Sequence, residues 1–303
     1  MKYINYSDFK LKNSAVCLGK FDGFHIGHRE LIDYAVSMKN NGYKAVIFSF
    51  LMNPRLLKNT EEFSLIYTEE EKKLIIKDAG ADVLISYPFD IPMFSMEPEC
   101  FIQKILVEQL DAKIVIVGKD YRFGHNRTGN VALLQELSSK YGYEVKTLDK
   151  VTYKDEVVSS TRIRACIKDG KMEEANLMLG MPYCIVGEVL HGRKLGRTLG
   201  MPTTNIVPDD VKLLPPNGVY ASRTWLNGVA YNGISNIGVK PTVGAEKKRL
   251  IETFIFDYSG NLYGKKLKVD LYAFERCEQK FDSIEELKAQ MELDTEFAKG
   301  YFK

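Results

Sequence analysis

Leu18-Gly19-Lys20-Phe21-Asp22-Gly23-Phe24-His25-Ile26-Gly27-His28 is the stretch that decides the fold of this chain. A short apolar run, Ala15 to Leu18, leads into it and is typical of a buried strand. Apolar residues recur at helical spacing in the segment that follows, Glu30 to Val36. Three glycines and two histidines therefore lie where a strand passes into a helix.

The start of a helix favours anions, because its first backbone N–H groups have no partner within the helix. Glycines at such a turn let the backbone approach a phosphate closely. His25 and His28 are three residues apart, so both rings can face one ligand. No third Cys, His or carboxylate stands at ligand spacing, which favours an anion site over a metal site. Two histidines near a turn also occur as ordinary surface residues.

The bulk composition is that of a soluble globular protein, with 45% hydrophobic and 27% charged residues in 303, enough for two domains. A net charge of +2 gives no global reason to expect nucleic acid or a membrane as partner. Five scattered cysteines fit a reducing compartment rather than a disulfide framework. We see no secretion signal or membrane-spanning run, and we expect a cytoplasmic protein.

The first half of the chain alternates strands and helices, which predicts βαβ units and a parallel sheet. The expected strands are 45–50, 83–86, 114–117 and 145–148, and the expected helices are 29–40, 68–79, 98–108 and 131–141. Thr68 and Glu71 have the spacing of a capping box. In such sheets ligands gather beyond the carboxyl ends of the strands, where the histidine turn would lie.

Two further stretches of this half are unusually polar. Gly118 to Gly124 follows a predicted strand and contains two cations, a carboxylate and two aromatic rings; it is either a solvated loop or part of the ligand site. Ser159-Ser160-Thr161-Arg162-Ile163-Arg164 opens a predicted helix. Its hydroxyls can be simple caps, whereas its two arginines in one turn favour a polyphosphate clamp.

The alternation stops near residue 182, where we place a domain boundary. Short strands with turns follow at 184–189, 218–225, 229–237, 250–256 and 267–274, which predicts an antiparallel sheet or small barrel. Asn227-Gly228 and Ser259-Gly260-Asn261 are hairpin signals. A C-terminal amphipathic helix is expected from Ile284 to about Lys299, capped by Ser283.

The most informative segment of the second half is the basic, glycine-rich loop that ends in Pro202-Thr203-Thr204-Asn205. It is either a surface hairpin or a cover for phosphates, and a threonine hydroxyl beside an asparagine can bind Mg²⁺ next to a nucleotide. Glu252 is a carboxylate in an otherwise apolar strand. It is either an edge-strand charge or the base that an alcohol kinase needs.

Residues 19–28 resemble the H-x-G-H nucleotidylyltransferases, and in the form G-x-F-D-G-x-H-x-G-H they are similar to the bacterial FAD synthetases. The polar loop resembles that family's G-x-D/N-x-x-F-G, and residues 159–164 resemble its S-S-T-x-I-R. The resemblance implies a Rossmann-like α/β fold in which His25 and His28 are catalytic. It further implies ATP or phosphate contacts at Gly19, Phe21, Gly27, Ser160, Thr161 and Arg164, and flavin contacts at Asp120 and Phe123.

The chain departs from the FAD synthetase pattern after the second predicted strand. Where the family has F-E/D-P-H-P, this chain has Phe50-Leu51-Met52-Asn53-Pro54-Arg55. Asn53 is left as the candidate flavin contact, and the change bears on flavin or nucleotide preference.

Residues 192–205 match G-x-x-L-G-R-x-L-G-x-P-T-x-N, the motif of the riboflavin kinases, and only Thr204 replaces the common alanine. The resemblance implies a small kinase barrel in which Thr203 binds the metal and Asn205 and Glu252 are catalytic. It also implies phosphate contacts from the basic loop, at Gly192, Lys194, Gly196 and Arg197.

We therefore predict two domains, residues 1–182 and 183–303, that convert riboflavin to FMN and FMN to FAD with ATP and Mg²⁺. Small molecules are the expected partners, and the sequence leaves the oligomeric state open. Two alternatives remain: a member with a single activity, and a flavin-binding regulator with none. Binding flavin alone would need none of His25, His28, Thr203, Asn205 and Glu252, which argues against the regulator.

Overall fold

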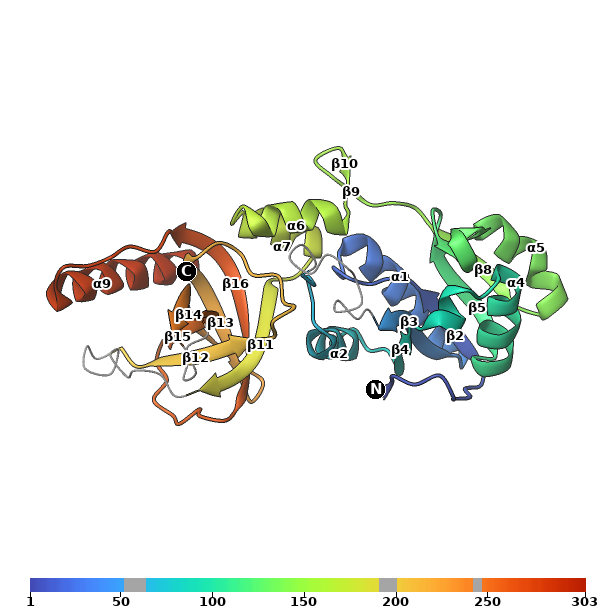
Figure 1. Cartoon of the computed structure of the whole chain (residues 1–303), viewed down its shortest axis with the longest axis horizontal. Helices are drawn as coiled ribbons and strands as arrows, with labels where there is room; N and C mark the ends of the chain where they lie inside the picture. Colours follow the sequence, from blue (N-terminus) through green and yellow to red (C-terminus); the bar gives the residue numbers. More distant parts are fainter. Residues whose placement is uncertain (52–63, 191–200, 242–246) are drawn as a thin grey trace. The chain divides into compact units, whose positions relative to one another are not determined.

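The computed structural model describes residues 1–51, 64–190, 201–241 and 247–303. Its described residues group into two compact units (Figure 1). Unit 1 comprises Met1–Phe63 and Lys72–Ser159, and unit 2 comprises Ser64–Glu71 and Ser160–Lys303. This division differs from the sequence-based boundary near residue 182, which stays a prediction.

Unit 1 is built on a parallel sheet in which six of its described strands run in the order β1-β4-β3-β2-β5-β8. These strands are β1 (Lys2–Ile4), β2 (Ser14–Leu18), β3 (Lys44–Leu51), β4 (Val83–Pro88), β5 (Ala112–Gly118) and β8 (Glu144–Leu148). β2 pairs with both β3 and β5, so the chain order reverses beside it. This is the switch point where open parallel sheets bind ligands, and the histidine turn follows β2 directly.

Helices and short hairpins make up much of the rest of the described part of unit 1. The helices are α1 (Ile26–Ser37), η1 (Met38–Asn41), α3 (Ile91–Phe94), α4 (Pro98–Phe101), the π-helix η3 (Ile102–Gln109), η4 (His125–Arg127) and α5 (Val131–Tyr141). The hairpins join β6 (Arg122–Phe123) to β7 (Gly129–Asn130), and β9 (Thr152–Tyr153) to β10 (Glu156–Val157). The predicted strands and helices of this half are confirmed.

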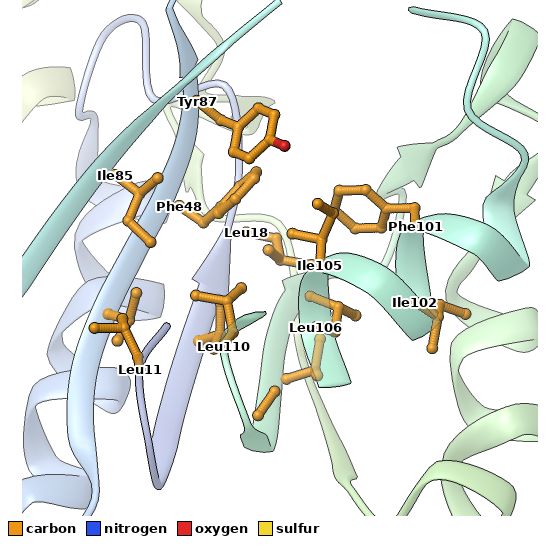
Figure 2. Close-up of a cluster of buried hydrophobic side chains, with 14 of the residues drawn as sticks. Leu11, Leu18, Phe48, Ile85, Tyr87, Phe101, Ile102, Ile105, Leu106 and Leu110 are labelled. Carbon is orange, nitrogen blue, oxygen red and sulfur yellow. The ribbon is translucent and has the colours of Figure 1, made fainter. Parts of the chain in front are cut away.

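A large apolar core holds the helices against the sheet. Figure 2 shows side chains of the strands, such as Phe48 and Ile85, on one side of this core and Phe101 and Ile105 on the other. All four are almost completely buried. Burying such side chains contributes about 1.5–3 kcal/mol each, so this core fixes the sheet that carries the turn.

Unit 2 contains a closed antiparallel barrel, which among the described strands follows the order β11-β12-β15-β14-β13-β16. The strands are β11 (Tyr183–Leu190), β12 (Thr203–Pro208), β13 (Gly218–Leu226), β14 (Val229–Pro241), β15 (Lys247–Ile255) and β16 (Lys266–Arg276). Hydroxyls of Ser222, Ser235 and Thr253 are linked by bonds of 2.7–2.8 Å inside the barrel. The predicted small barrel is confirmed.

Among the described residues of unit 2 beyond α2, three helices accompany the barrel: α6 (Ser160–Lys168), α7 (Met172–Leu179) and α9 (Ile284–Tyr301). Ser283 caps α9 by accepting the Glu286 backbone N–H at 3.1 Å, as predicted. Arg276 of β16 donates two hydrogen bonds to Asp294, at 2.8 and 2.6 Å. This charge-assisted pair fixes α9 beside the barrel.

The helix α2 (Glu69–Asp78) begins with the predicted capping box. The Thr68 N–H donates to Glu71 Oε2 at 2.8 Å, and the Glu71 N–H donates to Thr68 Oγ1 at 3.3 Å. Glu71 also pairs with Lys212, whose Nζ lies 2.7 Å from Oε2, and neither side chain is exposed to solvent. This buried ion pair joins the segment 64–71 to the rest of unit 2.

One hairpin of the barrel agrees with the sequence prediction, whereas a second hairpin and one strand differ from it. The Asn227-Gly228 hairpin is confirmed, because both residues have positive φ and Leu226 pairs with Val229. The Ser259-Gly260-Asn261 hairpin is wrong, because β15 pairs with β12 and β14 and not with β16. The strand β12 was expected to be part of a loop.

Candidate active sites

His25 and His28 lie together at the start of α1. The His25 ring caps the helix by accepting the His28 backbone N–H on Nδ1, at 3.3 Å. The two rings stack with centroids 3.7 Å apart. With Nδ1 acting as acceptor, the proton of neutral His25 is on Nε2, which makes that atom a donor. His28 Nδ1 is buried and makes no hydrogen bond to any described residue.

Two phenylalanines shape the turn before the histidines. Phe21 and Phe24 have positive φ angles of 45° and 41°, which bulky residues rarely adopt, and both rings are buried. The Phe21 ring packs edge-on against His28, with centroids 5.1 Å apart. An added Cβ at Gly19 would lie 2.7 Å from the end of the Phe21 ring, so glycine is required there. Phe21 therefore supports the histidines from the core. Its predicted contact with ATP stays a prediction.

Burial keeps both histidines uncharged at neutral pH. It lowers the pKa of His25 to about 4, against a smaller opposing effect of the Asp22 carboxylate. It lowers the pKa of His28 to about 3, and the neighbouring His25 adds to that effect. Both rings are thus neutral hydrogen-bonding groups in the free protein, rather than fixed cations.

These pKa values predict a stability that falls with acid. Below the ordinary histidine pKa of 6.5, the two histidines are protonated in the unfolded chain and stay neutral in the folded one. The free energy of unfolding therefore rises with pH between about 4 and 6.5. At pH 5 each histidine should lower the free energy of unfolding by about 2 kcal/mol. We expect hydrogen exchange of α1 to quicken between pH 7 and 5, with a shallower pH slope in His28→Gln. Equal pH slopes in the intact protein and in His28→Gln would contradict the lowered pKa of His28.

The predicted flavin contacts lie in different environments. Phe123 is buried in the core, with its ring centroid 5.5 Å from that of Phe101. Asp120 is exposed and forms an ion pair of 2.9 Å with Lys150. Asn53 lies outside the described residues, as do Gly192, Lys194, Gly196 and Arg197 of the basic loop.

Ser160 and Thr161 open α6, as predicted, and belong to unit 2. Arg164, one turn further on, donates a hydrogen bond to the backbone carbonyl of Ser64. That contact gives Arg164 a structural role in unit 2. Its predicted contact with phosphate stays a prediction.

The kinase residues of the barrel form one row across three strands. Asn205 of β12 and Asn236 of β14 both pair directly with Glu252 of β15, so the three side chains share the outer face. Thr203 Oγ1 donates to Glu252 Oε1 at 2.8 Å. Asn205 is only 8% exposed, and its amide has no hydrogen bond to a described residue. Asn236 was not among the predicted site residues, because cross-strand register is not visible in the sequence.

A cavity of about 330 Å³ borders Thr203, the hydrogen-bond partner of Glu252, although Asn205, Glu252 and Asn236 do not line it. Thr203 forms part of its wall, together with Pro202 and the β15–β16 connection from Tyr258 to Tyr263. Its volume is at the lower end for small-molecule sites. The basic loop that precedes Pro202 in the sequence is the segment predicted to cover phosphates.

Comparison with known proteins decides the family. A sequence model described as FAD synthetase matches residues 8–162, and one described as riboflavin kinase matches residues 179–302. The chain belongs to the bifunctional riboflavin kinase/FMN adenylyltransferase family. The relative of that name from Buchnera aphidicola (subsp. Schizaphis graminum) is 38% identical over 96% of this chain and 94% of its own length. The Bacillus subtilis relative of the same name is 35% identical over 95% and 92%.

One solved structure matches nearly the whole length of the chain. A crystal structure titled as a macrolide-efflux protein from Streptococcus pneumoniae superposes with a TM-score of 0.84 at 28% identity, covering 99% of each chain. Among the residues that the structure describes, no helix is long and apolar enough to cross a membrane.

Proposed function

We propose that the barrel unit phosphorylates riboflavin to FMN with ATP and that unit 1 adenylylates FMN to FAD, releasing pyrophosphate. The single observation that carries most weight is the row Asn205–Glu252–Asn236 with the Thr203–Glu252 hydrogen bond, placed beside a ligand-sized cavity. The stacked histidines at the switch point of the sheet support the second activity.

Adenylylation of FMN requires little covalent chemistry from the protein itself. The attacking group is the phosphate of FMN, which is already anionic, so no general base is needed. The required work is to position two phosphates and to stabilise the charge that develops on the departing pyrophosphate. The N–H groups that open α1, His25 Nε2 and the neutral His28 ring are the described groups of unit 1 suited to this.

Phosphorylation of an alcohol requires a base as well. We assign that role to Glu252, whose Oε1 is held by Thr203 and whose carboxylate can accept the proton of the ribityl hydroxyl. The in-line geometry of phosphoryl transfer then places the hydroxyl between Glu252 and the γ-phosphate. The cavity beside Thr203 is suited to the nucleoside part of ATP.

The donors around Glu252 fit Mg²⁺. Hydroxyl, amide and carboxylate oxygens are hard ligands, and the buried Asn205 amide lacks a partner among the described residues. No described group of three or more His, Cys, Asp or Glu could enclose a metal, which fits an ion held largely by substrate phosphates. Bound there by Thr203 and Asn205, Mg²⁺ would neutralise charge on the transferring phosphate. We further propose a cytoplasmic location, where ATP and flavins are available.

A substitution of His28 should separate the two reactions. We expect His28→Asn to lower FMN adenylylation about a hundredfold, the usual effect of losing one well-placed donor to a developing charge. Riboflavin phosphorylation by the same preparation should be unchanged and serves as the control for the integrity of unit 2. Chromatography of the flavins formed from riboflavin or from FMN measures both rates. An adenylylation rate equal to that of the intact protein would remove His28 from the site.

Turnover of the unmodified protein tests the proposal as a whole. With riboflavin, ATP and Mg²⁺ we expect FMN to appear first and FAD second, and chelation of Mg²⁺ should stop both. A reaction that ends at FMN would identify a kinase with a single activity. Flavin binding without any turnover would identify a flavin-binding regulator.

A further inference from the structure

We propose that Asn236 is a substrate-positioning residue of the kinase site, which holds the polyol hydroxyls of the acceptor alcohol beside Glu252. This inference rests on the proposed roles of Glu252, Thr203 and Asn205. The observation behind it is register: Asn236 of β14 pairs directly with Glu252. Directly paired residues of antiparallel strands have their Cβ atoms about 4.5–5.5 Å apart on one face.

The two neighbours of Glu252 stand on opposite sides of it. Asn205 lies on β12, next to Thr203 and on the side of the cavity proposed for the nucleotide. Asn236 lies on β14, on the other side. The backbones of β12 and β14 are two strand spacings apart, about 10 Å, which leaves room for a phosphoryl group above Glu252.

Phosphoryl transfer places the attacking and leaving oxygens roughly in line through phosphorus. If the nucleotide approaches over β12, the alcohol must approach from the side of β14. Asn236 is the residue that β14 presents at this position. Its amide makes no hydrogen bond to a described residue, so it is available to a substrate.

The chemistry of an amide suits this acceptor. Each hydroxyl of a polyol both donates and accepts a hydrogen bond, and an asparagine side chain offers both functions. The next rung of the same face is apolar, since Ile234 pairs with Phe254. Ile234 is buried in the apolar cluster that also contains Ala298 of α9, whereas Phe254 is only partly buried against that cluster. Riboflavin has a polyol chain attached to an apolar ring. It therefore matches the change from the polar pair Asn236–Glu252 to the apolar pair Ile234–Phe254.

The test compares Asn236→Ala and Asn236→Asp with the intact protein in steady-state riboflavin phosphorylation. Asp has the size of Asn but lacks the N–H donor and adds a negative charge beside Glu252. We expect both variants to lose 10- to 100-fold in kcat/KM for riboflavin, with the KM for ATP changed less than twofold. A residue with only a structural role would change the KM for riboflavin and the KM for ATP alike.

Asn232→Ser is the matched control. Asn232 lies on the same strand, but its Oδ1 accepts a hydrogen bond from Arg223 Nε at 2.8 Å, so it serves the barrel itself. We expect its kcat/KM for riboflavin to stay within twofold of the intact protein. FMN adenylylation, assayed in every preparation, reports on the integrity of the rest of the chain.

Three outcomes would overturn the inference: unchanged kinetics in Asn236→Ala, near-normal kinetics in Asn236→Asp, or a KM effect confined to ATP. Failure of the proposed Glu252 role gives a different result. Glu252→Ala would then retain phosphorylation, whatever the Asn236 variants do.

Discussion

Replacing Glu252 by glutamine is expected to lower riboflavin phosphorylation by a factor of 10² to 10⁴, because that range is typical for removal of a general base. Glutamine keeps the size of the side chain, and its amide oxygen can still accept the 2.8 Å hydrogen bond from Thr203 Oγ1. It cannot accept a proton at neutral pH. The rate of FMN formation from riboflavin and ATP measures the effect.

Formation of FAD from added FMN is the control for this variant. The histidine turn belongs to unit 1, and Glu252 belongs to unit 2. The Glu252→Gln protein should therefore adenylylate FMN at the normal rate. Loss of both reactions would point to damage to the fold, and normal phosphorylation would remove Glu252 from the chemistry.

Replacing Lys212 by methionine is expected to destabilise unit 2 by about 3–5 kcal/mol, because it leaves the Glu71 carboxylate buried without its cation. All three Nζ donors of Lys212 are used, each at 2.7 Å: by Glu71 Oε2 and by the carbonyls of Ile66 and Cys184. Its charge also lies 4.2 Å from the centre of the Tyr183 ring. Glu71 in turn accepts the backbone N–H of Val186 at 2.9 Å.

The single tryptophan, Trp225, lies in β13, so its fluorescence during urea unfolding reports on unit 2. Lys266→Met provides the matched control. Lys266 pairs with Glu70, the residue before Glu71, at the same 2.7 Å, but both side chains are about half exposed. Exposed pairs contribute at most about 1 kcal/mol. Equal losses in the two variants would show that burial does not give the Lys212 pair its importance.

Local patterns in the sequence were enough to predict the architecture of both units. The run 15–18 with its following turn gave β2 and α1, because strand and helix periodicities depend on neighbouring residues only. The capping box at Thr68, the Ser283 cap and the Asn227-Gly228 turn were predictable for the same reason. Where those local rules applied, the structure agrees.

The features that the sequence did not predict are contacts between segments that are distant in the sequence. Ser259-Gly260-Asn261 lies in the connection between β15 and β16, but hairpin-type residues do not specify which strands pair, and β15 and β16 are not neighbours in the barrel. Lys212 and Glu71 are far apart in the sequence, and charged residues are ordinarily assigned to the surface. Asn236 joins the candidate site only through the register of β14 against β15.

The predicted chemistry of the histidine turn also needed the structure. Spacing alone shows that His25 and His28 can face one ligand. Their charge depends on burial, which lowers the pKa of both rings far below the ordinary histidine value. The two residues therefore act as neutral donors and acceptors in the free protein.

The most direct test of two separate sites in one chain is a complementation measurement with the Glu252→Gln and His28→Asn variants. Each protein alone, given riboflavin, ATP and Mg²⁺, should form almost no FAD: the first because it makes no FMN, the second because it leaves FMN unconverted. An equimolar mixture should form FAD through the FMN that His28→Asn releases. Rapid FAD formation by either variant alone, or none by a mixture supplied with added FMN, would contradict the account.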